Sequence, residues 1–209
     1  MAKPTPPKKR ERRPAERPEE IATAALHLFC QKGYHATSID EIAEVAGVTK
    51  GAVYHHFDSK EDLLQTAMTA FFDEAFQQAM ESVAKEPEPD AVTQVRAVLQ
   101  AASELWIQAE ALAAFCLVFG EVGKAVPSLR ACFLERGPFR AWKALAELIR
   151  EGQKRGAFRA DVDPLVTART MACSLVLQSV LLPVAGRSRT QVRRALQESL
   201  ETQLKLLSR

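Results

Sequence analysis

The sequence predicts an all-α protein of about nine helices, in which a small three-helix unit precedes a longer helical body. Apolar residues make up 47% of the 209 residues and charged residues 26%, which is ordinary for a soluble globular protein. Leu and Ala are abundant, Gly is sparse, and no run alternates as a half-buried strand would. Apolar positions recur instead at three- and four-residue spacing, so helices are expected throughout.

The first expected helix spans about residues 18–32. Pro18 suits a first helical position, and two glutamates follow where the positive end of the helix dipole favours acids. One apolar stripe runs along the segment, and Gly33 is placed to end it. The stripe consists of Ile21, Ala24, Ala25, Leu28 and Phe29.

Residues 37–60, TSIDEIAEVAGVTKGAVYHHFDSK, predict two short helices joined by a tight turn. Thr37 or Ser38 caps the first, and Ser38 to Glu41 fits a capping box. Gly47 permits the turn, and Thr49 caps a second helix that closes near Phe57. The pattern is typical of a helix-turn-helix whose second helix enters the major groove of DNA.

Further helices are expected beyond this unit, separated by Pro- and Gly-containing breaks. A bend is expected at Gly137-Pro138. The approximate ranges of these further helices are 59–84, 91–108, 110–124, 127–155, 164–182 and 190–207.

The residue types of the second short helix suit contact with DNA. Thr49 and Lys50 stand at its N-terminus, where free backbone N–H groups attract phosphate. Tyr54 lies four residues after Lys50 and therefore shares its face. Gly51 would let the backbone approach a base or sugar, and His55 and His56 add imidazole donors.

The stretch AALHLFCQKGYHATSIDEIAEVAGVTKGAVYHHFDSKEDLL resembles the DNA-binding domain of the TetR (tetracycline repressor) family. The resemblance covers about 45 residues, from Ile21 to Leu64, and the body matches only in outline. It implies a helix-turn-helix domain followed by a helical effector-binding and dimerisation domain. By this resemblance, DNA contacts are expected from Thr37, Ser38, Thr49, Lys50, Gly51, Tyr54, His55, His56 and Lys60. The alternatives are that Thr37 and Ser38 serve only as helix caps and that His56 is a packed residue.

We expect three segments: a disordered basic arm over 1–16, a DNA-binding domain over 17–62 and the effector domain over 63–209. Residues 1–17 carry +5, which leaves −3 for the remainder of a chain whose net charge is +2. Residues 18–66 carry −5, so local placement rather than bulk charge must attract phosphate. The arm would add phosphate or minor-groove contacts, or else serve only as a solvated tail.

If the arm binds DNA, deleting residues 1–16 should weaken DNA binding and reduce its salt dependence, because fewer counterions would be released. Affinity measured across a salt series tests this. Unchanged affinity at every salt concentration would remove the arm from the mechanism.

The resemblance further implies a small-molecule pocket within the body. Pockets of this kind are mostly apolar with few polar anchors, so the effector would be a small hydrophobic or aromatic molecule. The alternative is that the same residues form an ordinary core and that the regulator has no effector. Expected lining residues are Trp106, Phe115, Cys116, Phe119, Phe133, Trp142 and Gln178.

The last two helices carry apolar faces that suit a homodimer built on a four-helix bundle, or that close the monomer's own core. A twofold dimer would place two recognition helices roughly 34–36 Å apart, or a multiple of that, on a near-palindromic operator. The expected interface residues are Leu165, Ala168, Ala172, Leu175, Val176, Ser179, Leu182, Val192, Leu196, Leu200, Leu204 and Leu207.

Other classes are disfavoured. No H-E-x-x-H, G-x-S-x-G or phosphate-loop motif occurs, so no enzyme is expected. The four cysteines form no C-x-x-C pair, so no metal site or cofactor is expected. We expect the cysteines to be buried, reduced thiols; a redox sensor is the alternative. No signal peptide is evident, and the longest apolar run, 111–119, is too short to span a bilayer, so a cytoplasmic location is expected.

Overall fold

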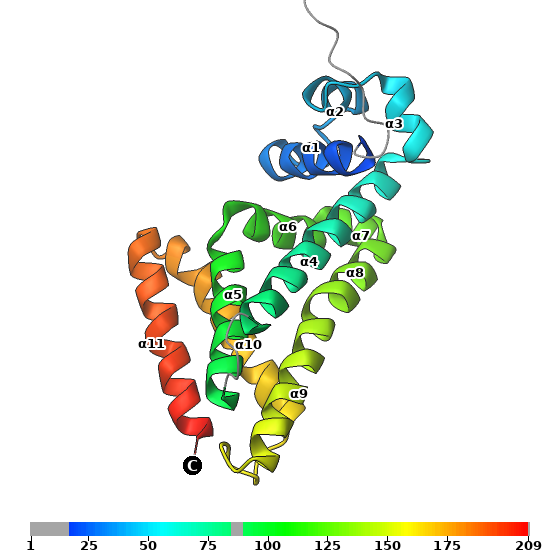
Figure 1. Cartoon of the computed structure of the whole chain (residues 1–209). Coiled ribbons are helices and arrows are strands. Elements are labelled where there is room, and N and C mark those ends of the chain that lie inside the picture. Colours follow the sequence, from blue (N-terminus) through cyan, green and yellow to red (C-terminus); the bar gives the residue numbers. More distant parts are fainter. Residues whose placement is uncertain (1–16, 85–89, 209) are drawn as a thin grey trace, which may run out of the picture.

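The computed structural model describes residues 17–84 and 90–208, and the basic arm expected at 1–16 lies outside them. Within the described residues the protein is built from helices, as predicted (Figure 1). The α-helices are α1 (Arg17–Lys32), α2 (Ile39–Val45), α3 (Lys50–His56), α4 (Lys60–Ala84), α5 (Ala91–Ile107), α6 (Ala109–Phe119), α7 (Glu121–Ala125), α8 (Pro127–Leu134), α9 (Arg140–Lys154), α10 (Pro164–Val184) and α11 (Arg189–Leu207). A π-helical segment, η1 (Glu135–Phe139), joins α8 to α9.

The described residues thus form eleven α-helices where about nine were expected. The expected helix over 110–124 divides at Gly120, whose extended backbone conformation ends α6 and begins α7. The bend expected at Gly137-Pro138 is the π-helical segment, because proline cannot supply the N–H that an α-helical turn requires. Pro183, expected to lie beyond a helix end, falls inside the last turn of α10.

Helices α1, α2 and α3 form a small head at one end of the molecule, and α4 leads from it into the body (Figure 1). The expected caps are confirmed: Ser38 and Glu41 form a capping box, and Thr49 accepts from the backbone N–H of Ala52. Gly47 has a φ of 65°, a conformation that costs a residue with a Cβ, and it makes the turn between α2 and α3. The head therefore has the geometry of a helix-turn-helix.

One apolar core runs from the head into the upper body. It includes Ile21 and Phe29 of α1, Val53 of α3, Met68 of α4 and Phe133 of α8. A second core lies between α5, α9, α10 and α11 in the lower body. The domain boundary proposed at 62/63 therefore falls inside the first turn of α4, and one core spans it.

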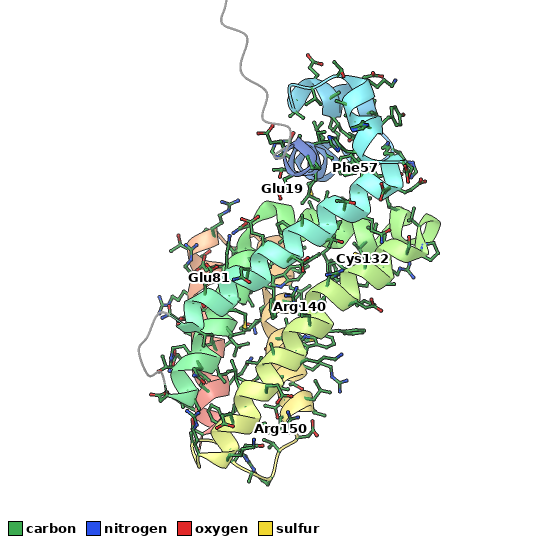
Figure 2. The ribbon with its side chains drawn as sticks, turned by 45° about the vertical axis from the view of Figure 1, so that its right-hand side comes forward. Glu19, Phe57, Glu81, Cys132, Arg140 and Arg150 are labelled. Atoms are coloured by element: carbon green, nitrogen blue, oxygen red, sulfur yellow. The ribbon has the colours of Figure 1, made fainter. Side chains whose placement is uncertain are left out.

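The start of α9 is fixed against α4. Arg140 places its guanidinium 3.9 Å from the centre of the Phe76 ring and pairs with Asp73, which also lies near Arg136 (Figure 2). The first core and these contacts hold α8 and η1 against α4, and Arg140 ties the start of α9 to the same helix.

Helix α10 is unusual because it is apolar and yet poorly covered. By length and composition alone it could cross a membrane, but only 22% of its most apolar stretch is buried in the monomer. A long apolar helix that remains exposed in a helical protein marks a surface for another partner.

Candidate nucleic-acid interface

The recognition helix α3 presents one face to the core and the other to solvent. Val53 and the following Phe57 are buried and fix α3 against α1 and α4. Because these two residues are four apart, the intervening positions turn outward. Tyr54 is 52% exposed, and Lys50 is exposed beside it.

Seven of the nine expected DNA-contact residues are exposed. Ser38 lies at the N-terminus of α2, and its hydroxyl is engaged in the capping box. The exposed members of the expected set are Ser38, Thr49, Lys50, Gly51, Tyr54, His55 and His56. The ion pair between Lys50 and Asp40 places the N-terminal turns of α2 and α3 beside each other.

Thr37 does not belong to this surface, and its expected role in direct side-chain contact with DNA is wrong. The residue is only 1% exposed. Its hydroxyl donates to the backbone carbonyls of Gly33, at 2.8 Å, and Leu28, at 3.3 Å. Thr37 therefore ties the chain leading into α2 to the end of α1, which is a structural task.

Lys50 is held in place by an acid that the sequence did not single out. Its Nζ lies 2.8 Å from Oδ2 of Asp40 on α2, and this pair raises the pKa of Lys50. Both side chains are exposed, so the pair contributes little to stability. The pair instead fixes the position of the Lys50 ammonium on the outer surface. A DNA phosphate that binds Lys50 would have to replace the Asp40 carboxylate.

Lys60, at the first turn of α4, lies over aromatic rings and points toward the protein. Its Nζ is 4.4 Å from the centre of the Tyr34 ring and 5.9 Å from that of Phe29. Partial burial lowers the pKa of Lys60. A phosphate contact from this residue would require its ammonium to leave the rings, so the DNA role expected for Lys60 stays a prediction.

Tyr34 completes this junction between head and body. Burial, the nearby charge of Glu61 and a hydrogen bond to the same carboxylate raise the pKa of Tyr34 to about 12. Because the neutral phenol is favoured in the folded state, its contribution to stability is present below pH 10 and is lost as the pH rises toward 12.

Spectrophotometric titration of Tyr54→Phe tests the environment of Tyr34, because that variant retains Tyr34 as its single tyrosine. We expect the folded protein to form tyrosinate with a midpoint near pH 12. Addition of Glu61→Gln should lower this midpoint, since it removes the negative charge. A midpoint near 10 in the folded Tyr54→Phe protein would contradict the described junction.

Gly51 has room for a side chain in the free protein. A Cβ placed there would meet only Oγ1 of Thr49, at 3.9 Å. We therefore expect Gly51→Ala to preserve the fold and not to lower its thermal stability. If the backbone of α3 approaches DNA here, the new methyl group should weaken DNA binding. Thermal unfolding and fluorescence anisotropy measure the two effects, and unchanged affinity would exclude close approach at Gly51.

Four of the seven expected pocket residues meet in the body. Trp106 lies 6.0 Å from Phe115, Phe115 lies 4.5 Å from Phe119, and Phe119 lies 5.6 Å from Phe133, all between ring centres. Phe72 of α4, which the sequence did not single out, extends this aromatic cluster at 5.0 Å from Phe133. The rings contact one another directly, so a ligand in this place would have to separate them.

The other three expected pocket residues lie elsewhere. Trp142 packs on Phe139 at 5.4 Å, and Gln178 donates to Oγ of Ser199 at 3.0 Å, between α10 and α11. Cys116 is exposed on α6. These three therefore do not line one pocket with the aromatic cluster, although Cys116 lines an open groove between α1 and α6. The expectation that all four cysteines are buried was wrong, because Cys173 is exposed as well as Cys116.

The dimer surface also needs correction. Eight of the expected residues are at most 3% exposed within the monomer, and all of them except Ser179 belong to the second core, so they cannot meet another subunit. These eight are Ala168, Leu175, Ser179, Val192, Leu196, Leu200, Leu204 and Leu207. Of the other four, Leu165 is exposed, and Ala172, Val176 and Leu182 are half-buried.

A different side of α10 is open. We define the outer face of α10 as Val166, Cys173, Leu177, Leu181 and Val184. Leu177 is 57% exposed, Leu181 54% and Val184 80%. The spacing of these residues follows the helical repeat, so they form one apolar stripe that the monomer leaves uncovered.

Both the head and the body match models of known protein families. Residues 21–67 match the model of bacterial regulatory proteins of the tetR family, and residues 93–204 match that of the AefR-like transcriptional repressor C-terminal domain. The chain is 30% identical over 146 residues to the HTH-type transcriptional repressor KstR2 of Rhodococcus jostii, covering 69% of each protein.

Solved structures show the same fold. A TetR-family transcriptional regulator from Mesorhizobium loti superposes with a TM-score of 0.80 at 23% identity, covering 95% of this chain and 100% of that one. The ketosteroid transcriptional regulator KstR2 of Mycobacterium tuberculosis superposes with a TM-score of 0.65 at 20% identity, covering 93% and 96%.

Proposed function

Because the chain belongs to the tetR family of bacterial regulatory proteins, we propose that it represses transcription as a homodimer that releases a near-palindromic operator when a small hydrophobic molecule binds. DNA-binding transcriptional regulation is the activity of the family, and the chain is not an enzyme. The main structural support for the proposal is the exposed face of α3, because the opposite face of this helix is packed in the core of the head.

The DNA contacts that we propose come from the exposed set on α2 and α3. Lys50 and the N-termini of both helices would bind phosphate, while Tyr54 and His55 would reach sugars or base edges. His56 and Gly51 are exposed as well. Two features support attraction of phosphate by individual groups rather than by the overall charge of the head. The head carries net negative charge, and Asp40 already orients Lys50.

The homodimer that we propose uses the outer face of α10. Its exposed leucines and valines would become buried against the same face of the second subunit, in a bundle with α11. This accounts for the apolar character of α10 without a membrane. We place the protein in the cytoplasm, where an operator is accessible, and assign DNA binding to residues 17–62 and dimerisation to the body.

We propose that the effector enters the body at the aromatic cluster. Separating Phe115, Phe119 and Phe133 would move α6 and α8 against α4, and α4 carries the head. A ligand can shift the protein from its DNA-bound state only if it binds the other arrangement more tightly.

Thermal unfolding with a panel of hydrophobic compounds tests the effector proposal. A compound that binds the native protein should raise the Tm, and the same compound should release labelled operator DNA in an anisotropy assay. Phe133→Ala should abolish both effects, whereas Phe139→Ala, outside the cluster, should preserve them. If no compound raises the Tm, the alternative of a regulator with a filled core and no effector gains support.

A further inference from the structure

Lys60 stands where the head joins the body. It is the first residue of α4, the helix that leads from the head into the body (Figure 1). Its Nζ lies 4.4 Å from the centre of the Tyr34 ring and 5.9 Å from that of Phe29, and both rings belong to the head. Lys60 therefore joins the start of α4 to the aromatic end of the head.

Tyr34 is held by two successive residues of α4. The ammonium of Lys60 lies over its ring, and its hydroxyl is hydrogen-bonded to the carboxylate of Glu61. The ring of Tyr34, which is buried, also packs at 5.4 Å from that of Phe29. Together these contacts connect the segment between α1 and α2 to the first turn of α4.

The contacts to Tyr34 are directional, whereas the apolar burial beside them is not. Leu63 and Leu64 of α4 share the first core with α1, which keeps the head on α4. Burial of this kind depends mainly on the apolar area removed from water. A cation, by contrast, is attracted to the face of an aromatic ring, and a hydrogen bond weakens steeply when it is bent. The Lys60 and Glu61 contacts are therefore suited to fix the direction in which the head points.

We propose that Lys60 is a positioning residue for operator recognition, which sets the angle between the head and α4 through Tyr34 and thereby the half-site spacing that the dimer accepts. The proposal rests on the proposed function, because spacing has meaning only for a dimer on DNA. Adjacent base pairs are about 3.4 Å apart, so a small rotation of each head is enough to move α3 by one base pair. On this account Lys60 stays over Tyr34 when DNA binds and makes no phosphate contact.

Lys50 and Lys60 thus have different tasks. Lys50 is exposed and pairs with Asp40 at the surface, so a phosphate can replace this carboxylate at little cost. Lys60 is half-buried, and a desolvated ammonium is attracted to a ring more strongly than an exposed one. Moving Lys60 to a phosphate would break its contact with Tyr34.

The first test measures the affinity of two variants for the near-palindromic duplex that selection from a random DNA pool enriches. Lys60→Gln removes the ammonium, whereas Tyr34→Leu removes the ring and leaves the ammonium free to reach DNA. We expect each variant to weaken binding at least about fivefold and to keep the salt slope of the original protein. A phosphate contact from Lys60 predicts instead a slope lower by about 2 in Lys60→Gln and no weakening in Tyr34→Leu, and either result would overturn the proposal.

Half-site spacing is the second readout, and a merely structural role would not change it. Binding is compared with that to two further duplexes, in which one base pair is inserted or removed between the half-sites. We expect the preference for the selected spacing to fall at least about threefold in Lys60→Gln and in Tyr34→Leu. An unchanged preference would overturn the proposal.

Two variants serve as controls for the spacing preference. Lys60→Arg keeps a cation that can stack on the Tyr34 ring, so it should retain the preference of the original protein. Lys143→Gln removes the same charge as Lys60→Gln but from the exposed surface of α9, and it should leave both the preference and the affinity unchanged.

The contact itself is tested without DNA, by a double-mutant cycle in urea unfolding. Lys60→Gln should lower the free energy of unfolding, and this loss should disappear in the Tyr34→Leu background. Additive losses would overturn the proposal. If Tyr34→Leu does not fold, the salt slope and spacing preference of Lys60→Gln decide. If the coupling is present but no near-palindrome is enriched, the proposed function has failed, and with it the role in spacing, while the junction itself stands.

Discussion

Replacing Leu177 by Glu should convert the dimer into monomers and weaken operator binding by at least about a hundredfold. Leu177 is 57% exposed in the monomer and lies in the middle of the outer face of α10. In a twofold interface the substitution buries two like charges without partners, which costs several kcal/mol. In the monomer the same carboxylate remains in water, so the fold should persist.

Gln197→Glu is the matched control, because it adds the same charge to an exposed position of α11. Gln197 lies one turn from both Arg193 and Glu201, which pair with Glu104 and Arg96 of α5, and therefore away from the outer face of α10. It should leave the dimer and its DNA affinity unchanged. Light scattering gives the mass of each variant, and a dimeric Leu177→Glu would exclude this face as the interface.

Lys50→Ala should weaken operator binding by about tenfold or more and reduce its salt dependence. Each protomer would lose one phosphate contact, so the slope of log K against log salt should fall by roughly 0.9 per contact, or about 2 for a dimer. The substitution also leaves Asp40 without its cation on the surface that meets DNA. Repulsion of phosphate by this carboxylate adds to the loss.

Two further variants separate these effects. Asp40→Asn, which frees Lys50 and removes a negative charge, should strengthen binding at low salt. Lys143→Ala removes a positive charge from the exposed surface of α9 and should change neither the affinity nor the slope. A salt slope in Lys50→Ala equal to that of the original protein would show that Lys50 does not contact phosphate.

The head was predicted well because its signals are local. The capping box of Ser38 and Glu41, the Thr49 cap and the turn at Gly47 each depend on residues within a few positions of one another. Apolar spacing then fixes which faces of the helices are buried. Thr37 was misplaced because its hydroxyl donates to the carbonyls of Leu28 in α1 and of Gly33 just after α1, and the spacing of apolar residues does not reveal this contact.

The body was predicted less well because periodicity shows that a face is apolar but does not show what covers it. Leu196 and Leu200 of α11 cover the monomer's core, whereas Leu177 and Leu181 of α10 are left open. The pairing of Lys50 with Asp40 and the open groove between α1 and α6 likewise arise from neighbours that are distant in sequence or belong to different helices. Such neighbours are set by packing, which one sequence does not reveal.

Selection of bound duplexes from a random DNA pool tests the central claim most directly, because it examines the head and the dimer together. A dimer joined at α10, with one α3 from each subunit on DNA, should enrich a near-palindrome. Its half-sites should be centred one DNA turn apart, roughly 34–36 Å, or a multiple of that. Enrichment of a single half-site without symmetry, or of no sequence at all, would contradict the account.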